Sequence, residues 1–308
     1  MWPETRAVAD PLTGFPVPRA AIDRLIDAAL DEDIGPGDVT TLSTVPISRR
    51  AAAVMLAKAP GTIAGLPVAA AVFARVDPRI DFTLVVDDGA VVMGQRDVVA
   101  RLAGSARSIL TAERVALNIV QRLSGVATLT ARCVAAVEGT DTRILDTRKT
   151  TPGLRTLEKY AVRMGGGSNH RTGLYDGVLI KDNHIRAAGG ITAAVASARV
   201  ALQPLLRVEV EVSTMHELDE ALDAGADMIL LDNMTLEMLR EATARVRNWT
   251  GVRPSLEASG GMTLEKLRAV AETGVDFISL GALTHSAPAL DISLDITGEE
   301  DPRGDAAS

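Results

Sequence analysis

The sequence predicts an α/β protein in which an N-terminal α+β domain precedes an α/β barrel. Short β-rich runs, Gly/Asp turns and helical runs mix up to about residue 110. After Gly139 the chain alternates strand-like and helix-like segments, which implies parallel strands joined by right-handed crossovers. Six of these strand-like runs end in charged, polar or glycine residues, which is where barrel enzymes place their chemistry.

Composition excludes several classes of protein. The chain has 308 residues, of which 47% are hydrophobic and 23% charged, a mix typical of a globular protein with a full core. The longest apolar stretch, 65–74, is about half of the roughly 20 residues that a spanning helix needs. No signal pattern opens the chain, so we expect a cytoplasmic protein without a membrane partner. Cys133, the single cysteine, lies in an apolar helical run and is expected in the core.

Charge is unevenly distributed along the chain. The net charge of −8 argues against binding to nucleic acid or anionic membranes. Residues 143–186 nevertheless contain nine Lys/Arg against four Asp/Glu. A local basic patch in an acidic protein suits a small anionic ligand, and a solvated basic face is the alternative.

The N-terminal half is expected to contain an arm, a helix, short strands and a long helix. Residues 1–20 carry four prolines and are interpreted as an arm. Helical spacing of apolar residues predicts a helix over 20–31. The run 98–110 is interpreted as helix-like, with Gly104 as an interruption. A long helix is expected from Thr111, with Gly125 ending or bending it.

The second half is expected to alternate strands and helices. Thr214 and Glu217 form a capping box, and Gly225 and Gly274 stand where residues that follow helix ends belong. The predicted strands are 143–147, 177–182, 206–212, 226–232, 253–258 and 275–280. The predicted helices are 191–202, 214–224, 235–248 and 263–273.

A doubly wound sheet and a closed barrel both fit such an alternation. No GxGxxG motif follows a strand, so a dinucleotide-binding fold has no support. The polar strand ends favour the barrel. In chain order they are Arg148 and Lys149, Lys181 and Asp182, Glu209 and Glu211, Asp232 and Asn233, Ser259 to Gly261, and Gly281.

These strand ends suggest a substrate that carries carboxylates and phosphates. Cations converging on one mouth bind carboxylates or phosphates. Two carboxylates on neighbouring strands, Glu211 and Asp232, suit Mg²⁺ shared with a phosphate ligand. Backbone amides at 258–261 and 280–282 can hold a terminal phosphate. Glu209 points to the same face of its strand as Glu211, and a buried strand does not place two acids inward without a reason.

The remaining histidines and the glycine run are less informative. His184 either belongs to the site or orders its loop, and both interpretations stay open. His216 is expected on the surface. Tyr160 and the glycines 165–167 are interpreted as loop.

Long strings of this sequence resemble the quinolinate phosphoribosyltransferase family, in family order, from about Asp31 to Ile296. They are ERVALNIVQRLSGVATLT (113–130), DTRKTTPGLR (146–155), EKYAVRMGGGSNHRTGLYDGVLIKDNHI (158–185), VEVEV (208–212), DMILLDNM (227–234), LEASGG (256–261) and ISLGALTHS (278–286).

The resemblance implies a fold, a reaction and a set of site residues. The reaction is transfer of phosphoribose from phosphoribosyl pyrophosphate to quinolinate, with loss of CO₂ to give nicotinate mononucleotide, a step of NAD biosynthesis that uses Mg²⁺. Quinolinate is expected to be held by Arg148, His170, Arg171, Lys181 and, from a partner subunit, Arg114. Phosphoribosyl pyrophosphate is expected to contact Thr147, Lys149, Glu211, Asp232, Ser259, Gly260, Gly261, Leu280, Gly281 and Ala282. Lys149, Glu211 and Asp232 are the expected catalytic residues, and Glu211 and Asp232 the metal ligands.

The resemblance also implies a homodimer with shared active sites and leaves a higher oligomer open. It predicts an arm (1–20), an α/β sandwich domain (21–118, joined by 287–308) and an incomplete, TIM-like α/β barrel (119–286) that carries the active site.

Three alternatives remain at this point. A paralogous phosphoribosyltransferase associated with molybdate transport would act on another carboxylated base. A Schiff-base lyase would use Lys181, because a lysine at a strand end can serve in that way. A metabolite-binding regulator would keep the pocket without turnover.

Overall fold

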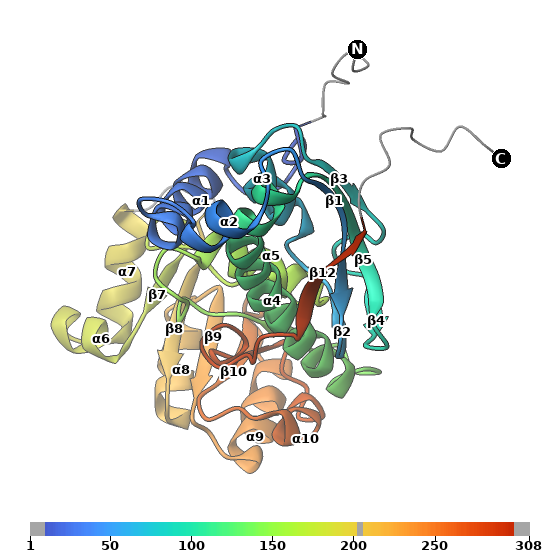
Figure 1. The fold of residues 1–308 in the computed structure, drawn as a ribbon. Coiled ribbons are helices and arrows are strands. Elements are labelled where there is room, and N and C mark those ends of the chain that lie inside the picture. Colours follow the sequence, from blue (N-terminus) through green and yellow to red (C-terminus); the bar gives the residue numbers. More distant parts are fainter. Residues whose placement is uncertain (1–9, 202–205, 299–308) are drawn as a thin grey trace. The chain divides into compact units, whose positions relative to one another are not determined.

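The computed structural model describes residues 10–201 and 206–298 (Figure 1). The elements, in chain order, are α1 (Arg19–Ile34), α2 (Val39–Thr44), β1 (Arg50–Ala57), β2 (Pro60–Thr62), α3 (Leu66–Val76), β3 (Asp81–Leu84), β4 (Val91–Met93), β5 (Asp97–Ser105), α4 (Ala106–Ala136), β6 (Arg143–Leu145), α5 (Arg155–Met164), β7 (Val178–Ile180), α6 (Asp182–Ala188), α7 (Ile191–Ala201), β8 (Val208–Val212), α8 (Met215–Asp223), β9 (Met228–Asp232), α9 (Leu236–Arg247), β10 (Ser255–Ser259), the 3₁₀ turn η1 (Leu264–Lys266), α10 (Leu267–Ala271), β11 (Phe277–Ser279), α11 (Ala282–His285) and β12 (Ile292–Gly298).

The described chain divides into two compact units, and this division differs from the predicted domain boundaries. Unit 1 holds residues 10–128, 152–165 and 287–298, and unit 2 holds 129–151, 166–201 and 206–286. The predicted boundary at residue 118 and the assignment of 152–165 to the barrel domain stay predictions. Part of the predicted arm (1–9), residue 202 of a predicted helix and the tail from 299 lie outside the described residues.

Unit 1 is built on an antiparallel sheet with helices packed on it. The strand order is β12-β1-β5-β3, and β2 pairs with β4 in a second, two-stranded sheet. Helix α1 packs against α3 and buries Ile22, Ile26 and Leu30, one face of a helix at the predicted spacing. Helix α3 is buried almost throughout, and its Phe73 is among the largest fully buried side chains. The result is the predicted α/β sandwich.

In the N-terminal half, the helix expected over 98–105 is wrong, and so is the alternative that Gly125 ends the long helix. Residues 97–105 form strand β5 rather than a helix, because they pair with both β1 and β3, and Gly104 leaves room for Ile80, 3.1 Å from where a Cβ would stand. Helix α4 then begins at Ala106 and continues through Gly125 to Ala136. Gly125 serves close approach instead of termination, because a Cβ there would overlap the carbonyl oxygen of Pro288.

Unit 2 is an incomplete parallel barrel. Its strand order is β6-β11-β10-β9-β8-β7, and every neighbouring pair is parallel. Strands β7 to β11 follow in chain order and the first strand, β6, lies beside the last, which is the order of a barrel and not of a doubly wound sheet. The described residues give β6 and β7 no shared ladder. Ser168 instead forms a single parallel bridge with Leu145 of β6. The six predicted strands and the barrel interpretation are confirmed.

Helices alternate with these strands as predicted. Helix α7 packs against β7, β8 and α8, and α10 packs against α9 and β11. Thr214 accepts a hydrogen bond from the Glu217 backbone, as the capping box requires, and Gly225 has a positive φ of 74°. Figure 1 shows α7, α8, α9 and α10 following one another along unit 2. No helix in the described part of the chain combines the length and apolar character needed to cross a bilayer.

Candidate active site

Four polar side chains stand at the carboxyl ends of neighbouring strands of unit 2, and we call them the strand-end cluster. The four are Lys181, Glu211, Asp232 and Ser259, from β7, β8, β9 and β10. Parallel strands end at the same edge of a sheet, and the register pairs Asp232 directly with Ser259. The predicted convergence of these side chains is therefore present in the fold.

The Lys181 ammonium forms an ion pair with the Glu211 carboxylate. Lys181 follows β7 and precedes α6, and its backbone N–H donates to Nδ1 of His184 (2.9 Å). Of the two interpretations of His184, the structure supports the ordering of its loop. The Lys181 side chain is 46% exposed, which leaves it open to a ligand.

Asp232 is tied to the glycine loop that follows β10. Nδ2 of Asn233 donates to Asp232 (2.8 Å), and the Asn233 backbone N–H donates to the Ser259 carbonyl (3.0 Å). Gly260 has a φ of +89°, and a Cβ there would lie 2.9 Å from the Asn233 backbone nitrogen. Only glycine combines this backbone conformation with so close a neighbour. The predicted phosphate loop 259–261 and the predicted acid Asp232 thus form one connected structure.

Lys149 lies against the second predicted phosphate loop, 280–282. The Thr284 hydroxyl donates to the Lys149 carbonyl (2.8 Å), and the Thr147 hydroxyl accepts from the Lys149 backbone N–H (3.0 Å). A Cβ at Gly281 would lie 2.8 Å from Cδ of Lys149 and 3.1 Å from the ring of His285. His285 was not among the predicted site residues. Its position within the string ISLGALTHS (278–286), four residues after Gly281, was the available signal.

Arg148 and Arg171 lie close enough for their charges to interact. Burial and then the Arg148 guanidinium lower the pKa of Arg171, while the carboxylates of Glu209 and Asp176 oppose this. Nη1 of Arg171 also donates to the Gly177 carbonyl (3.0 Å). Two cations held together in this way favour a ligand that carries negative charge.

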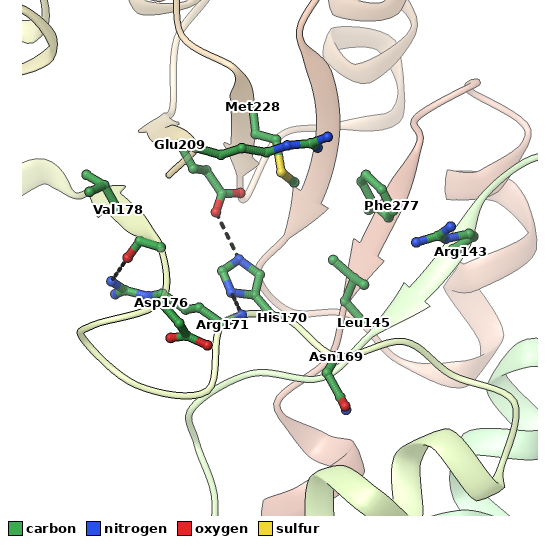
Figure 2. A pocket seen from close by; sticks show the side chains of 12 residues that line it. Arg143, Leu145, Asn169, His170, Arg171, Asp176, Val178, Glu209, Met228 and Phe277 are labelled. Atoms are coloured by element: carbon green, nitrogen blue, oxygen red, sulfur yellow. Dashed lines mark hydrogen bonds and ion pairs between the residues drawn. The ribbon is translucent and has the colours of Figure 1, made fainter. Parts of the chain in front are cut away.

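His170 is engaged with protein groups at both ring nitrogens. Nε2 lies 2.9 Å from a Glu209 oxygen and 3.5 Å from a Glu257 oxygen. Nδ1 accepts the backbone N–H of Arg171 (2.7 Å). Figure 2 shows the ring turned toward Glu209. The predicted contact between His170 and a quinolinate carboxylate stays a prediction, and Glu257 is a site residue that the sequence did not single out.

The cavity of Figure 2 lies around this histidine rather than around the strand-end cluster. It encloses about 220 Å³. Many of its lining residues stand at the starts of strands, at the opposite end from Lys181 and Asp232. The lining residues are Arg143, Leu145, Asn169, His170, Arg171, Asp176, Gly177, Val178, Arg207, Glu209, Met228 and Phe277. His170 and Arg171 are the two predicted site residues that reach it.

The remaining predictions concern Arg114, Cys133 and His216. Arg114 lies on α4 in unit 1, and its side chain is exposed. Cys133 is buried, and burial raises the pKa of its thiol to about 11, so the prediction of a core residue is confirmed. His216 is exposed, as expected.

Both halves of the chain match domains of one enzyme family. The description "Quinolinate phosphoribosyl transferase, N-terminal domain" matches residues 38–124, and "Quinolinate phosphoribosyl transferase, C-terminal domain" matches residues 126–295. The two matches follow each other in order and together span the described elements from α2 to β12.

Curated proteins and solved structures agree with this match. A probable nicotinate-nucleotide pyrophosphorylase (carboxylating) of Synechocystis sp. is 46% identical over 286 residues, 93% of this chain and 96% of that protein. The protein of the same name from Bacillus subtilis is 45% identical over 276 residues, 90% and 93% of the two chains. The crystal structure of NadC from Streptococcus pyogenes superposes with a TM-score of 0.87 at 40% identity and covers 92% of this chain and 99% of its own. The nicotinate-nucleotide pyrophosphorylase of Francisella tularensis gives 0.86 at 42% identity, with 91% and 97% covered.

Proposed function

This chain belongs to the quinolinate phosphoribosyltransferase family, and from that premise we propose that it makes nicotinate mononucleotide for NAD biosynthesis. The pyridine nitrogen of quinolinate bonds to the anomeric carbon of phosphoribosyl pyrophosphate, and pyrophosphate leaves. The carboxylate next to that nitrogen then leaves as CO₂, and a proton takes its place. The observation that carries the proposal is the strand-end cluster, which places the Lys181 cation beside the acids Glu211 and Asp232 and beside Ser259, where the glycine loop begins.

Quinolinate is a dianion, and the cations of unit 2 supply its binding site. Arg148, Arg171 and Lys181 neutralise its two carboxylates, and guanidinium groups give paired contacts to such ligands. The electrostatic interaction between Arg148 and Arg171 supports this assignment, because two neighbouring cations are stabilised by an anion bound near both. His170 contributes through its contact with Arg171.

Phosphoribosyl pyrophosphate is assigned to the remaining residues at the carboxyl ends of the unit 2 strands. Lys149 contacts the pyrophosphate, and Thr147, whose hydroxyl accepts from the Lys149 backbone, orders that turn. Glu211 and Asp232 hold the ribose hydroxyls. The ribose phosphate is bound by backbone amides of the two loops, that is by Ser259, Gly260 and Gly261 and by Leu280, Gly281 and Ala282.

The donor set at the strand ends fits Mg²⁺. Glu211 and Asp232 offer hard oxygen ligands from the adjacent strands β8 and β9, and Mg²⁺ in enzymes is held by one or two carboxylates together with substrate phosphates. When bound there, the ion supplies charge neutralisation on the departing pyrophosphate.

Catalysis in this site is electrostatic. Positive charge develops at the anomeric carbon as pyrophosphate departs, and the carboxylates of Glu211 and Asp232 stabilise it, while Lys149 stabilises the negative charge on the leaving group. Once the ring nitrogen carries the ribose, it accepts the electrons that decarboxylation releases. The protein then has to orient the carboxylates and needs no side-chain nucleophile.

The assembly is proposed to be a homodimer with shared active sites in the cytoplasm. Arg114 supports the shared site, because this cation is exposed on a helix whose neighbouring residues Val115, Ala116 and Leu117 are buried. From that position it would complete the quinolinate site of the partner subunit.

The alternatives explain these features less well. The relatives carry the name of the carboxylating enzyme, so a paralogue for another base is not favoured. A Schiff-base lyase would not need the paired acids Glu211 and Asp232, and the Lys181 amine that it would use is engaged in an ion pair with Glu211. A regulator would not need both an acid pair and Lys149.

One assay tests the proposed reaction. The purified chain is incubated with quinolinate, phosphoribosyl pyrophosphate and Mg²⁺, and nicotinate mononucleotide and CO₂ are measured by mass spectrometry. We expect both products in equal amounts and their loss with EDTA. Binding of phosphoribosyl pyrophosphate without product would refute quinolinate as the base, and borohydride trapping of a lysine adduct would favour the lyase.

A further inference from the structure

Three polar side chains form a buried cluster inside the barrel, and their protonation states determine which hydrogen bonds the cluster can make. His170, Glu209 and Glu257 each place a nitrogen or oxygen atom within 4.8 Å of the others. Glu209 and Glu257 are only 4% and 1% exposed. They stand on β8 and β10, below the level of Glu211 and Ser259, so the group lies beneath the strand-end cluster.

Three of the four oxygens of these two carboxyl groups form no hydrogen bond with the described residues. One oxygen of Glu209 and both oxygens of Glu257 are buried, and no donor among the described residues reaches them. The Ser279 hydroxyl donates to Ser259 (3.0 Å) and also lies close enough to Glu257 to lower the pKa of that carboxyl, an effect smaller than that of burial. Two bare carboxylates at this depth would be costly, because burial without partners disfavours charge. A cation or a proton must therefore accompany them.

The hydrogen bonds of His170 distinguish a bound metal cation from a proton. Nδ1 accepts the Arg171 backbone N–H at 2.7 Å, so this nitrogen carries no proton. The proton of the neutral ring is then on Nε2, which points at Glu209 (2.9 Å). A metal ion needs the lone pair of that nitrogen, and a protonated Nε2 has none to give. The geometry therefore favours a proton over a metal ion.

We propose that Glu257 is a protonated positioning residue that donates its hydrogen bond to Glu209 and so holds His170 as the neutral Nε2–H tautomer beside Arg171. In this hydrogen-bond network, Glu257 donates to Glu209. His170 donates from Nε2 to the same Glu209 carboxylate and accepts at Nδ1 from the Arg171 backbone N–H. Burial and the neighbouring Glu209 charge raise the pKa of Glu257 to about 8, which agrees with a proton at neutral pH.

This inference rests on the proposed function, and it names what the buried group contributes to that function. A proton on Glu257 leaves one negative charge under the quinolinate site instead of two. The second charge would repel the dianion and compete for the Arg171 guanidinium, whose interaction with Glu209 is already present. A fixed His170 ring also holds the Arg171 backbone in place. The group therefore tunes binding of the dicarboxylate and not the departure of pyrophosphate.

The first test reads the tautomer directly. The chain has four histidines, so ¹⁵N-histidine labelling gives few ring signals, and the signals of His170 are those missing in H170N. We expect an unprotonated Nδ1 and a protonated Nε2 at pH 7, and no bound metal by elemental analysis. An imidazolium, an Nδ1–H tautomer or one transition-metal ion per chain would overturn the proposal.

The second test uses two variants of Glu257. E257Q keeps the size and a donor N–H, whereas E257L removes the donor. We expect E257Q to retain the His170 tautomer and to raise the KM for quinolinate by less than about threefold, and E257L to raise it by about tenfold with a smaller change in kcat. Equal effects of both variants, or a change confined to kcat, would refute the positioning role.

The two proposals fail separately. If the wild-type chain shows the expected tautomer but no turnover of quinolinate, the proposed reaction is wrong and the proton on Glu257 stands. If turnover is present and His170 is an imidazolium, the reaction stands and the role of Glu257 is wrong. E272Q, which alters an exposed glutamate of unit 2 that pairs with Arg268, is the control for a general effect of replacing a glutamate by glutamine.

Discussion

Replacing Gly260 by alanine tests the link between the glycine loop and Asp232. The residue has a φ of +89°, and an added Cβ would stand 2.9 Å from the Asn233 backbone nitrogen and closer still to its side-chain amide. The amide of Asn233 in turn donates to Asp232. The substitution therefore displaces the loop and the acid together.

The magnitude follows from two separate costs. A left-handed backbone costs a non-glycine residue roughly 1–2 kcal/mol. The overlap adds roughly 1–3 kcal/mol, the usual cost of overpacking a fitted site, because the nitrogen would have to retreat to reach the 3.4 Å of ordinary contact. If the loop moves to relieve this strain, binding of the ribose phosphate suffers instead, and a loss of ~1.4 kcal/mol corresponds to a tenfold rise in KM.

Gly139 provides a matched control in the same unit. Its φ is +79°, and nothing lies within 4 Å of where a Cβ would be. In G139A the free energy of unfolding should fall only by the cost of the left-handed backbone, roughly 1–2 kcal/mol. Its KM for phosphoribosyl pyrophosphate should stay at the wild-type value. Urea denaturation measures the free energy of unfolding, and initial rates with varied phosphoribosyl pyrophosphate measure KM.

The two variants together can refute the reasoning. Equal losses of stability in G260A and G139A would show that the close contact with Asn233 costs nothing. A folded G260A with the wild-type KM for phosphoribosyl pyrophosphate would remove residues 259–261 from the phosphate site.

Three further predictions concern the shared site, the pyrophosphate contact and pH. R114A and R148A should each be inactive, and mixing them should restore part of the activity through one intact site per hybrid dimer; hybrids that form but stay inactive would disprove the shared site. K149A should raise the KM for phosphoribosyl pyrophosphate at least about tenfold and leave quinolinate binding, measured by calorimetry, nearly unchanged; equal losses would contradict its role. The folded pKa of Glu257, about 8, lies above its ordinary value of 4.5, so the unfolded chain loses this proton first and the free energy of unfolding should fall as pH rises from 4.5 to 8. E257Q should show a shallower fall in urea denaturation across that range, and parallel curves would argue against a buried proton.

The barrel could be predicted because its signal is repeated along the chain. Each strand-like run ends in a residue such as Lys181 or Asp232, and each is followed by a helix whose capping residues are local in sequence. Strand ends and helix caps of this kind can be recognised in the sequence without knowledge of the tertiary structure. The same logic placed Lys149 and the 280–282 loop at one edge, where the structure has them.

The missed elements depend on partners that are distant in sequence. The expectation of a loop at Tyr160 is wrong, because Tyr160 lies on helix α5, where Glu158 and Lys159 are buried among apolar residues. Glu158 is tolerated there since it pairs with Arg122, and the Tyr160 hydroxyl donates to Asp88 (2.7 Å). No spacing rule connects residues so far apart.

Glu257 was not predicted as a site residue because its partners are also distant in sequence. In the string LEASGG, Glu257 has the pattern of a strand residue beside a glycine loop. Its role depends on Glu209 and His170, which lie near it only in the folded barrel. The run 97–105 is similar, because its strand character comes from pairing on both sides with β1 and β3. Tertiary pairing overrides local propensity at such places.

The pairing of β12 with β1 has a consequence for synthesis of the chain. Ala57 pairs with Ile292, so one edge of the first sheet waits for a strand made more than 230 residues later. At ~5–20 residues per second this delay is on the order of ten to fifty seconds. During that time the barrel strands are translated while β1 offers an open edge, the kind of surface that promotes misassociation. Ribosome-bound chains halted before residue 292 should therefore depend on chaperones more than the finished protein does.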